Sequence, residues 1–271
     1  MKIELITIIK WLSCNKLSFN ASKTEFMIFD GIDETGELSV EILGTCIKIS
    51  ECKVTKYLGL MLDCKLTFKQ HVDYIKGKIM KRLGAMYRSS KLLPVKYRKM
   101  FANALMLPQF DYLDTIYCRA SKTKLAELDL LYKKVGKIAL GVPQTESSIT
   151  IYRDMKWLPL HLRRQLHLSN YMYRIMNDNC PTNFRNKFRY VSGGRSSDNC
   201  NLYVDRSSSH KEFYYLGAKC WNNLPSETRT ISDITWFSKA YKNQLLLSST
   251  TDPNYVTNNS FEHLYSPLDI T

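Results

Sequence analysis

The sequence predicts an α+β fold that is predominantly α-helical and has a small antiparallel β patch near its N-terminus. Residues 38–49 alternate between apolar and polar side chains around Gly44-Thr45, which is typical of a β-hairpin. Residues 66–90 repeat apolar side chains every three or four positions, which predicts a long helix. From residue 94 onward, helical patterns follow one another with proline, glycine or serine between them. The β patch is therefore expected only in the first part of the chain.

The charge of the chain points to a polyanionic partner. Its 271 residues suffice for one large domain or two moderate ones, and its hydrophobic (44%) and charged (24%) fractions are ordinary for a folded protein. The net charge of +14 is not ordinary. Such an excess favours nucleic acid first and an anionic membrane second. The alternative is a soluble protein that is merely basic.

Neither a secretory signal nor a membrane span is expected. Glu4 stands where a signal peptide would be basic, and the apolar run over residues 3–12 is interrupted and too short to cross a bilayer. We therefore expect an intracellular protein, in the cytoplasm or the nucleus, without a membrane partner. The cysteines contain no Cys-x-x-Cys pair and are expected to be reduced, buried thiols rather than zinc ligands. They are Cys14, Cys46, Cys52, Cys64, Cys118, Cys180, Cys200 and Cys220.

The N-terminal part is expected to begin with an amphipathic helix over residues 2–14 and a polar loop that ends at Thr24. A strand over residues 25–29, a turn-rich connector over residues 30–36 and the hairpin follow.

One further strand is expected over residues 54–62, and it contains Tyr57, Leu58 and Gly59. A glycine inside a strand often marks a bulge or a close approach of another backbone. The alternation alone is equally consistent with an ordinary sheet strand. Asp63 follows this strand and is expected to cap the next turn.

The predicted helix over residues 66–90 has one basic face. Its apolar stripe consists of Val72, Ile75, Ile79, Leu83 and Tyr87. Basic side chains at helical spacing can neutralise successive phosphates without reading bases, although a charge run is usually a solvated face. Asp73 opposes these cations, which are Lys69, Lys76, Lys78, Lys81, Arg82 and Arg88, with Lys91 just beyond them.

A second helix is expected to begin near Pro94, because proline suits the first turn of a helix. It carries Lys96, Arg98 and Lys99. The side chains that it is expected to bury are Met100, Phe101, Ala104 and Leu105.

Later helices are expected over residues 121–141, 147–155, 160–177 and 213–224, and a last helix closes at residue 247. Ser121 is expected to cap the first of these helices, and Ser147 to open the second. Trp157 and Trp221 are expected in the core, whereas His161, Arg163 and Arg164 are expected to form a basic surface. The serine- and glycine-rich residues 192–197 are the expected linker.

Two motifs carry a resemblance to a known family. Trp11 is followed by Asn15-Lys-Leu-Ser-Phe-Asn-Ala-Ser-Lys-Thr24 and Met27-Ile-Phe29, and residues 57–63 read Tyr-Leu-Gly-Leu-Met-Leu-Asp. This combination resembles the back half of the palm in reverse transcriptases of non-LTR retrotransposons, the jockey-like and LINE-like group. Cys220-Trp-Asn-Asn-Leu-Pro225 resembles a signature of the same group further along the chain.

The resemblance implies an order of segments. Residues 1–64 would be a partial palm remnant, and residues 65–120 a thumb-like helical region. Residues 121–186 would be a helical extension, and residues 187–247 a C-terminal segment of mixed strand and helix. Residues 248–271 are polar and are expected to form a flexible tail.

The resemblance also implies roles for particular residues. The parent activity would be that of an RNA-directed DNA polymerase, with Mg²⁺ as its cofactor. Lys23 stands at the position of a lysine that lies beside the phosphates of the incoming nucleotide. Tyr57, Leu58 and Gly59 stand at the primer grip, and the helices after residue 65 at the thumb, which lies along the template–primer duplex. In that family, the aspartate pair that binds the metals lies before the position of the first residue here.

This chain alone is predicted to be inactive. Polymerase chemistry needs clustered carboxylates that hold two metal ions, and the sequence has no Asp-Asp pair. Asp111 and Asp114 are about one helical turn apart and could share a face. No nucleophile elbow, phosphate-binding glycine loop or His-Glu-x-x-His motif occurs. We expect no catalytic residue, metal, cofactor or small-molecule ligand in this chain.

The leading hypothesis is weak, sequence-tolerant binding of RNA or DNA, through Tyr57, Leu58, Gly59 and the cations of the helix over residues 66–90. A non-catalytic helical protein-interaction module is one alternative. A retrotransposon relic without any function is another, and no sequence feature excludes it.

Overall fold

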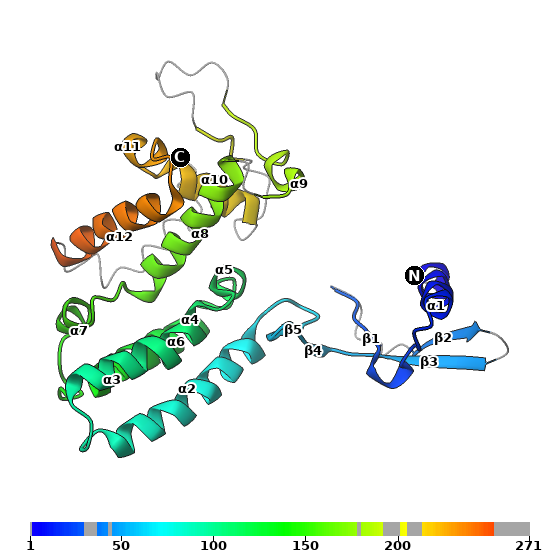
Figure 1. Ribbon diagram of the computed structural model, residues 1–271, viewed down its shortest axis with the longest axis horizontal. Coiled ribbons are helices and arrows are strands. Elements are labelled where there is room, and N and C mark those ends of the chain that lie inside the picture. Colours follow the sequence, from blue (N-terminus) through cyan, green and yellow to red (C-terminus); the bar gives the residue numbers. More distant parts are fainter. Residues whose placement is uncertain are drawn as a thin grey trace. The chain divides into compact units, whose positions relative to one another are not determined.

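The computed structural model confirms the predicted fold class, because helices predominate and the strands are short and N-terminal (Figure 1). It describes residues 2–29, 37–42, 45–177, 180–191, 201–204 and 213–251. The chain divides into two compact units, Met1–Tyr74 and Ile75–Thr271, and each is described by itself. The five segments inferred from the sequence stay predictions.

The first unit combines one helix with short strands. Its elements are α1 (Lys2–Cys14), η1 (Ala21–Lys23), β1 (Glu25–Phe26), β2 (Glu37–Ile42), β3 (Thr45–Glu51), β4 (Val54–Tyr57), β5 (Leu60–Asp63) and the start of α2 (Lys69–Ser89).

A three-stranded sheet in the order β1-β3-β2 forms the body of this unit. β2 and β3 are antiparallel, with Leu38 opposite Ile49, so the predicted hairpin is confirmed, although residues 43 and 44 of its turn lie outside the described residues. Alternation places Leu38, Val40 and Ile49 on one face, where Leu5 and Ile6 of α1 pack against them. β1 pairs with β3 in parallel, so the patch is mixed rather than wholly antiparallel.

The single strand expected over residues 54–62 is wrong, because β4 and β5 form a tight antiparallel hairpin. Its two-residue turn consists of Leu58 at φ 45° and Gly59 at φ 87°. Positive φ at both central residues defines the type of turn whose twist matches two antiparallel strands. Asparagine or aspartate usually precedes the glycine in such turns. Because Leu58 stands at that position, the sequence lacks the usual mark of a hairpin. The glycine is a turn residue and not a bulge.

Asp63 confirms its predicted role as a cap. Its Oδ1 accepts a hydrogen bond from the Thr67 amide (2.9 Å), and its Oδ2 accepts one from the Phe68 amide (2.8 Å). These amides precede the first turn of α2 and would otherwise lack partners. The carboxylate therefore fixes the passage from β5 into the long helix.

The second unit is helical. Ser121 and Ser147 cap α6 and α7 by accepting the amides of Lys124 (3.4 Å) and Ile149 (3.3 Å), as the sequence predicts. Besides the rest of α2, its elements are α3 (Val95–Phe101), the π-helix η2 (Ala102–Met106), α4 (Leu107–Asp111), α5 (Asp114–Tyr117), α6 (Lys122–Leu140), α7 (Ser148–Met155), α8 (Leu160–Met176), α9 (Thr182–Arg185), α10 (Phe213–Asn222), α11 (Ser226–Arg229) and α12 (Ile234–Thr251).

The core of this unit lies on both sides of α8. Trp221 of α10 and Phe237 of α12 are buried in one cluster with α8, where the ring of Phe237 lies 4.5 Å from that of Tyr173. Trp157 is buried as well, and its ring stacks on that of Tyr132 at 4.6 Å. Both tryptophans are therefore core residues, as predicted.

Several predictions fall outside the described residues or need correction. The connector over residues 30–36, the linker over residues 192–197 and the last twenty residues of the tail lie outside them, whereas residues 248–251 continue α12. The seven described cysteines are free, but only Cys118 and Cys220 are buried as expected. Cys52, Cys64 and Cys180 are half-buried, and Cys14 and Cys46 are exposed. Among the helices described, none is both long and apolar enough to pass through a membrane.

Candidate nucleic-acid interface

The orientation of α2 decides which of its side chains can meet a partner. Its buried apolar side chains are Val72, Ile75, Ile79, Leu83 and Met86, each at most 4% exposed. Tyr87, which the sequence placed in this stripe, is 67% exposed. From Leu83 the stripe can continue by three residues to Met86 or by four to Tyr87. Because a helix has about 3.6 residues per turn, four turns after Val72 lead to Met86 rather than Tyr87. The tyrosine ring therefore lies on the outer side of the helix.

The helix after Pro94 also presents other side chains than expected. Met100, Ala104 and Leu105 are exposed, and Phe101 is half-buried, whereas Ala102 and Met106 are buried. The π-helix η2 explains the exposure of Ala104 and Leu105, because its wider turn holds an extra residue and shifts the phase of the helix. Met100 lies before η2, on the outer side of α3. The sequence pattern alone assumes one constant period, so it selects the wrong face.

Two of the predicted cations are engaged inside the second unit. Lys76 pairs with Glu127 of α6, and Lys124 Nζ lies 3.2 Å from the same carboxylate. Arg82 Nη1 donates to the carbonyl of Leu105 in η2. These contacts join α2 to its neighbours, so both side chains are already committed to the packing of the unit. Lys78 is half-buried.

Four other cations point into solvent on the outer side of α2, in the turn that follows it and at the start of α3. None of their side chains has a hydrogen bond or ion pair with another described residue. Residues 74–110 contain nine lysines and arginines and no acidic residue. The exposed four are Lys81, Arg88, Lys91 and Lys96.

Large apolar side chains are exposed among these cations. Tyr87 lies in the last turn of α2, Leu92 lies in the turn after it, and Tyr97 and Met100 belong to α3. We call the whole set the α2–α3 surface, and define it by Met80, Lys81, Tyr87, Arg88, Lys91, Leu92, Lys96, Tyr97 and Met100. It combines positive charge with aromatic rings.

The remaining predicted site residues belong to the first unit. Lys23 is exposed at the end of η1, where its amide donates to Asn20 Oδ1 (3.2 Å). Tyr57 and Leu58 are exposed at the β4–β5 turn beside Gly59, and Lys69 is exposed at the first residue of α2. The structure therefore gathers Tyr57, Leu58 and Gly59 in one turn. Their binding roles stay predictions.

Ionisable side chains from α4, α5 and α8 meet inside the second unit, and the sequence alone did not indicate this cluster. Donor atoms of Asp111, Asp114 and His167 lie within 4.8 Å of one another, a spacing that could hold a metal ion. Both oxygens of Asp111, however, accept hydrogen bonds from Arg163. Asp114 Oδ2 lies 2.6 Å from His167 Nδ1. Since each carboxylate already has a cationic or histidine partner, the cluster is an ion-pair network that ties α4 and α5 to α8.

Burial changes the acid–base behaviour of this network. The pKa of Asp114 is raised because the carboxyl group is buried, although the hydrogen bond from His167 opposes the shift. Burial likewise raises the pKa of Asp129 on α6. Raised carboxyl pKa values can mark functional sites, but structural ion-pair networks also produce them. Here burial inside the ion-pair network accounts for the raised pKa of Asp114.

The basic surface expected at His161, Arg163 and Arg164 is wrong. His161 is 5% exposed and Arg164 is 4% exposed. The guanidinium of Arg164 lies 5.8 Å from the ring of Tyr117, which offers its face to the cation. Burial, with the charges of Arg164 and Lys133, lowers the pKa of His161 to about 4, so the imidazole is neutral. Because this part of α8 packs against helices on several sides, His161 and Arg164 are enclosed although they are polar.

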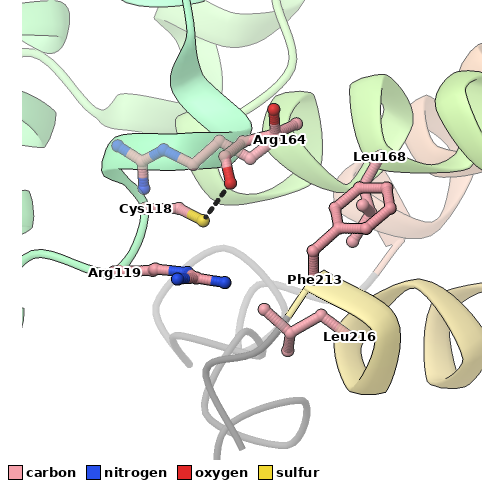
Figure 2. Close-up of a pocket in the computed structure, with 7 residues that line it drawn as sticks. Cys118, Arg119, Arg164, Leu168, Phe213 and Leu216 are labelled. Carbon is pink, nitrogen blue, oxygen red and sulfur yellow. Dashed lines mark hydrogen bonds between the residues drawn. The ribbon is translucent and has the colours of Figure 1, made fainter. Parts of the chain in front are cut away.

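A small pocket lies where α5, α8 and α10 approach one another (Figure 2). Figure 2 shows the side chain of Arg119 extending toward Leu216, whereas the guanidinium of Arg164 points away from Leu216 and Phe213. Cys118 Sγ donates to the carbonyl of Thr115 (3.1 Å). Arg164 therefore contributes its aliphatic stem to the pocket wall rather than its charge.

Taken together, these features define a mostly helical α+β protein with one basic, aromatic helical surface. Over 132 residues the chain is 23% identical to a Drosophila melanogaster protein described as a probable RNA-directed DNA polymerase from transposon X-element. The match covers 48% of this chain and 14% of that protein. No family model matches the chain, and no solved structure matches it. The similarity supports a relationship to the reverse transcriptases of retrotransposons.

Proposed function

We propose that this chain corresponds to the late palm, the thumb and a helical extension of a retrotransposon reverse transcriptase, and that it binds nucleic acid without catalysing polymerisation. The α2–α3 surface is the binding element. The observation that carries the proposal is the set of four exposed cations in a stretch of residues 74–110 without any acidic residue.

Several features support an interaction with phosphates. Lys81 and Arg88 are seven residues apart on α2, about two helical turns, so both lie on the outer side of the helix. Lys91 and Lys96 continue the positive charge into the turn and α3. Cations without protein partners can release counterions from a phosphate backbone, which gives affinity without base specificity. Binding is therefore weak, sequence-tolerant and sensitive to salt.

Residues of the first unit extend the proposal. Tyr57, Leu58 and Gly59 form an exposed turn at which a primer strand would be held, and Lys69 adds a further charge. Lys23 keeps the position of the leaving-group lysine, but it has no use without a metal-bound triphosphate. The metal ions of the parent activity belong with carboxylates that this sequence does not contain. No catalytic step is proposed for this chain.

Charge reversal of three exposed cations tests the proposal. The variant Lys81→Glu, Arg88→Glu, Lys91→Glu should weaken the binding of an RNA–DNA hybrid by at least tenfold. A matched control, Lys134→Glu, Arg174→Glu, Lys187→Glu, reverses three cations that are also exposed, so both variants change the net charge by the same amount. Fluorescence anisotropy with a labelled hybrid measures both.

The two variants separate a local site from a general charge effect. The proposal requires the control to bind within about threefold of the wild type. Equal loss in both variants would show that net charge alone drives association. The wild type and the variant with Lys81, Arg88 and Lys91 reversed could also bind one protein partner equally well while neither binds nucleic acid. That result would favour a protein-interaction module instead.

A further inference from the structure

Two tyrosines on the α2–α3 surface are exposed without a role in the core. Tyr87 is 67% exposed and Tyr97 is 52% exposed. Neither ring contacts another described aromatic ring or cation. Met86 fills the core position beside Tyr87, so the fold of α2 does not need the tyrosine. A surface that combines cations with exposed aromatic rings is complementary to a partner that has both negative charge and flat apolar faces.

Hydrogen bonds to the backbone order the turn between α2 and α3, which separates the two tyrosines. The amide of Ser90 donates to the Tyr87 carbonyl (3.2 Å), and the Ser90 hydroxyl donates to the same oxygen (2.7 Å). The amides of Leu92 and Leu93 both donate to the Ser89 carbonyl (3.0 Å each). At the far side of the turn, the Tyr97 amide donates to the Pro94 carbonyl (3.0 Å). Both tyrosines are therefore anchored at the two ends of one hydrogen-bonded turn.

From this arrangement we infer that the α2–α3 surface binds an unpaired nucleic-acid strand, whose bases stack on Tyr87 and Tyr97 while its phosphates meet the surrounding cations. The inference rests on the proposed function and names its ligand more closely. Bases in a duplex are stacked inside the helix and offer no free face, whereas unpaired bases can stack on aromatic side chains. Stacking tolerates any base, which agrees with binding that does not read sequence.

The combination of cations and rings favours nucleic acid over other partners that could bind a basic surface. Residues 87–97 contain both tyrosines and three exposed cations, Arg88, Lys91 and Lys96. A single strand repeats one base and one phosphate per nucleotide and can satisfy both groups at each position. An acidic protein would use the same charges without needing the rings as stacking platforms.

The test compares single-stranded and duplex ligands on the full chain. Anisotropy titrations use a labelled 15-nucleotide RNA of low secondary structure and a blunt RNA–DNA hybrid of the same length. The variants are Tyr87→Ala with Tyr97→Ala, and Tyr87→Phe with Tyr97→Phe. A control changes two other exposed tyrosines, Tyr171→Ala with Tyr203→Ala. Circular dichroism checks that all variants keep the helical content of the wild type.

We expect the alanine pair to weaken single-strand binding by about tenfold or more, because each lost stack lowers the affinity severalfold. Binding of the hybrid should stay within about twofold, and the phenylalanine pair and the control should match the wild type. If the alanine pair binds the single strand as tightly as the wild type does, the inference is wrong. The proposed function would still stand in that case, provided that the wild type binds the hybrid. An equal loss on both ligands would also overturn it.

Two further outcomes separate the partner classes. If the wild type binds neither ligand at low salt, the proposed function fails and the inference fails with it. If the tyrosines are required for sedimentation with phosphatidylserine vesicles but not for RNA binding, the surface is a membrane contact and the inference is wrong.

Discussion

Arg163 of α8 and Asp111 of α4 form an ion pair in which the guanidinium Nε and Nη2 each donate to one carboxylate oxygen. Fifty-two residues separate them in the sequence. Two parallel hydrogen bonds fix the relative orientation of the two groups as well as their distance. Together with the neighbouring pair of Asp114 and His167, this contact locks the short helices α4 and α5 against α8.

Removing one partner of this pair should destabilise the second unit strongly. Asp111→Ala leaves the enclosed guanidinium of Arg163 without its carboxylate, and we expect a loss of about 2–4 kcal/mol in the free energy of unfolding. The double variant Asp111→Leu, Arg163→Met removes both charges and should recover more than half of that loss. Urea unfolding, followed by circular dichroism, measures all three proteins. A loss below about 0.5 kcal/mol in Asp111→Ala would contradict the structural role of the pair.

His161 should make the protein less stable in mild acid. Its pKa is about 4 in the folded protein and 6.5 as the ordinary value, because burial disfavours the charged imidazole. Between these two pH values the unfolded chain binds a proton that the folded chain does not, so stability falls as the pH is lowered through this window. The full difference corresponds to about 3 kcal/mol.

The variant His161→Leu isolates this contribution. When the pH is lowered from 7 to 4.5, the free energy of unfolding of the wild type should fall by about 2–3 kcal/mol more than that of the variant. The reason is that the variant has no imidazole to protonate. Chemical unfolding at both pH values gives the comparison. A constant difference between the two proteins across this range would show that the imidazole is not held neutral.

Two glycines provide opposite tests of helix packing. At Gly77 on α2 an added Cβ would meet nothing within 4 Å, so Gly77→Ala should stabilise the protein by about 1 kcal/mol through helix propensity. At Gly136 on α6 the added Cβ would lie 2.4 Å from Ile151 Cγ2 of α7. Gly136→Ala should therefore destabilise it by about 1–3 kcal/mol. Thermal unfolding measures the change in stability of each variant relative to the wild type. If both changes had the same sign, the close packing of α6 on α7 would be contradicted.

The helices of the second unit were largely predictable, because their apolar periods and capping serines are local signals. Ser121, Ser147 and Asp63 each act as the sequence indicated. Local patterns failed where the period itself changes. The π-helix at residues 102–106 carries no sequence mark of its own, so the exposure of Ala104 and Leu105 could not be derived.

The site was predicted less completely than the fold. The cations of α2 were identified by their spacing, but spacing could not tell that Lys76 and Arg82 bind groups far away in the sequence. Nor could it tell that Arg164 lies in the core, because a run of histidine and arginines on a helix is usually solvated. Tyr87 was missed as a surface residue because Tyr87 and Met86 are both apolar enough for the stripe. Long-range contacts decide such cases.

The most direct test of the account is the salt dependence of nucleic-acid affinity for the wild-type chain. If Lys81, Arg88, Lys91 and Lys96 each neutralise about one phosphate, the affinity for a duplex should fall roughly a hundredfold between 50 and 200 mM salt. Anisotropy titrations with a labelled RNA–DNA hybrid at three salt concentrations give this slope. A steep, linear decline of log affinity with log salt is the predicted result. No binding at 50 mM salt, or binding that does not change with salt, would contradict the account.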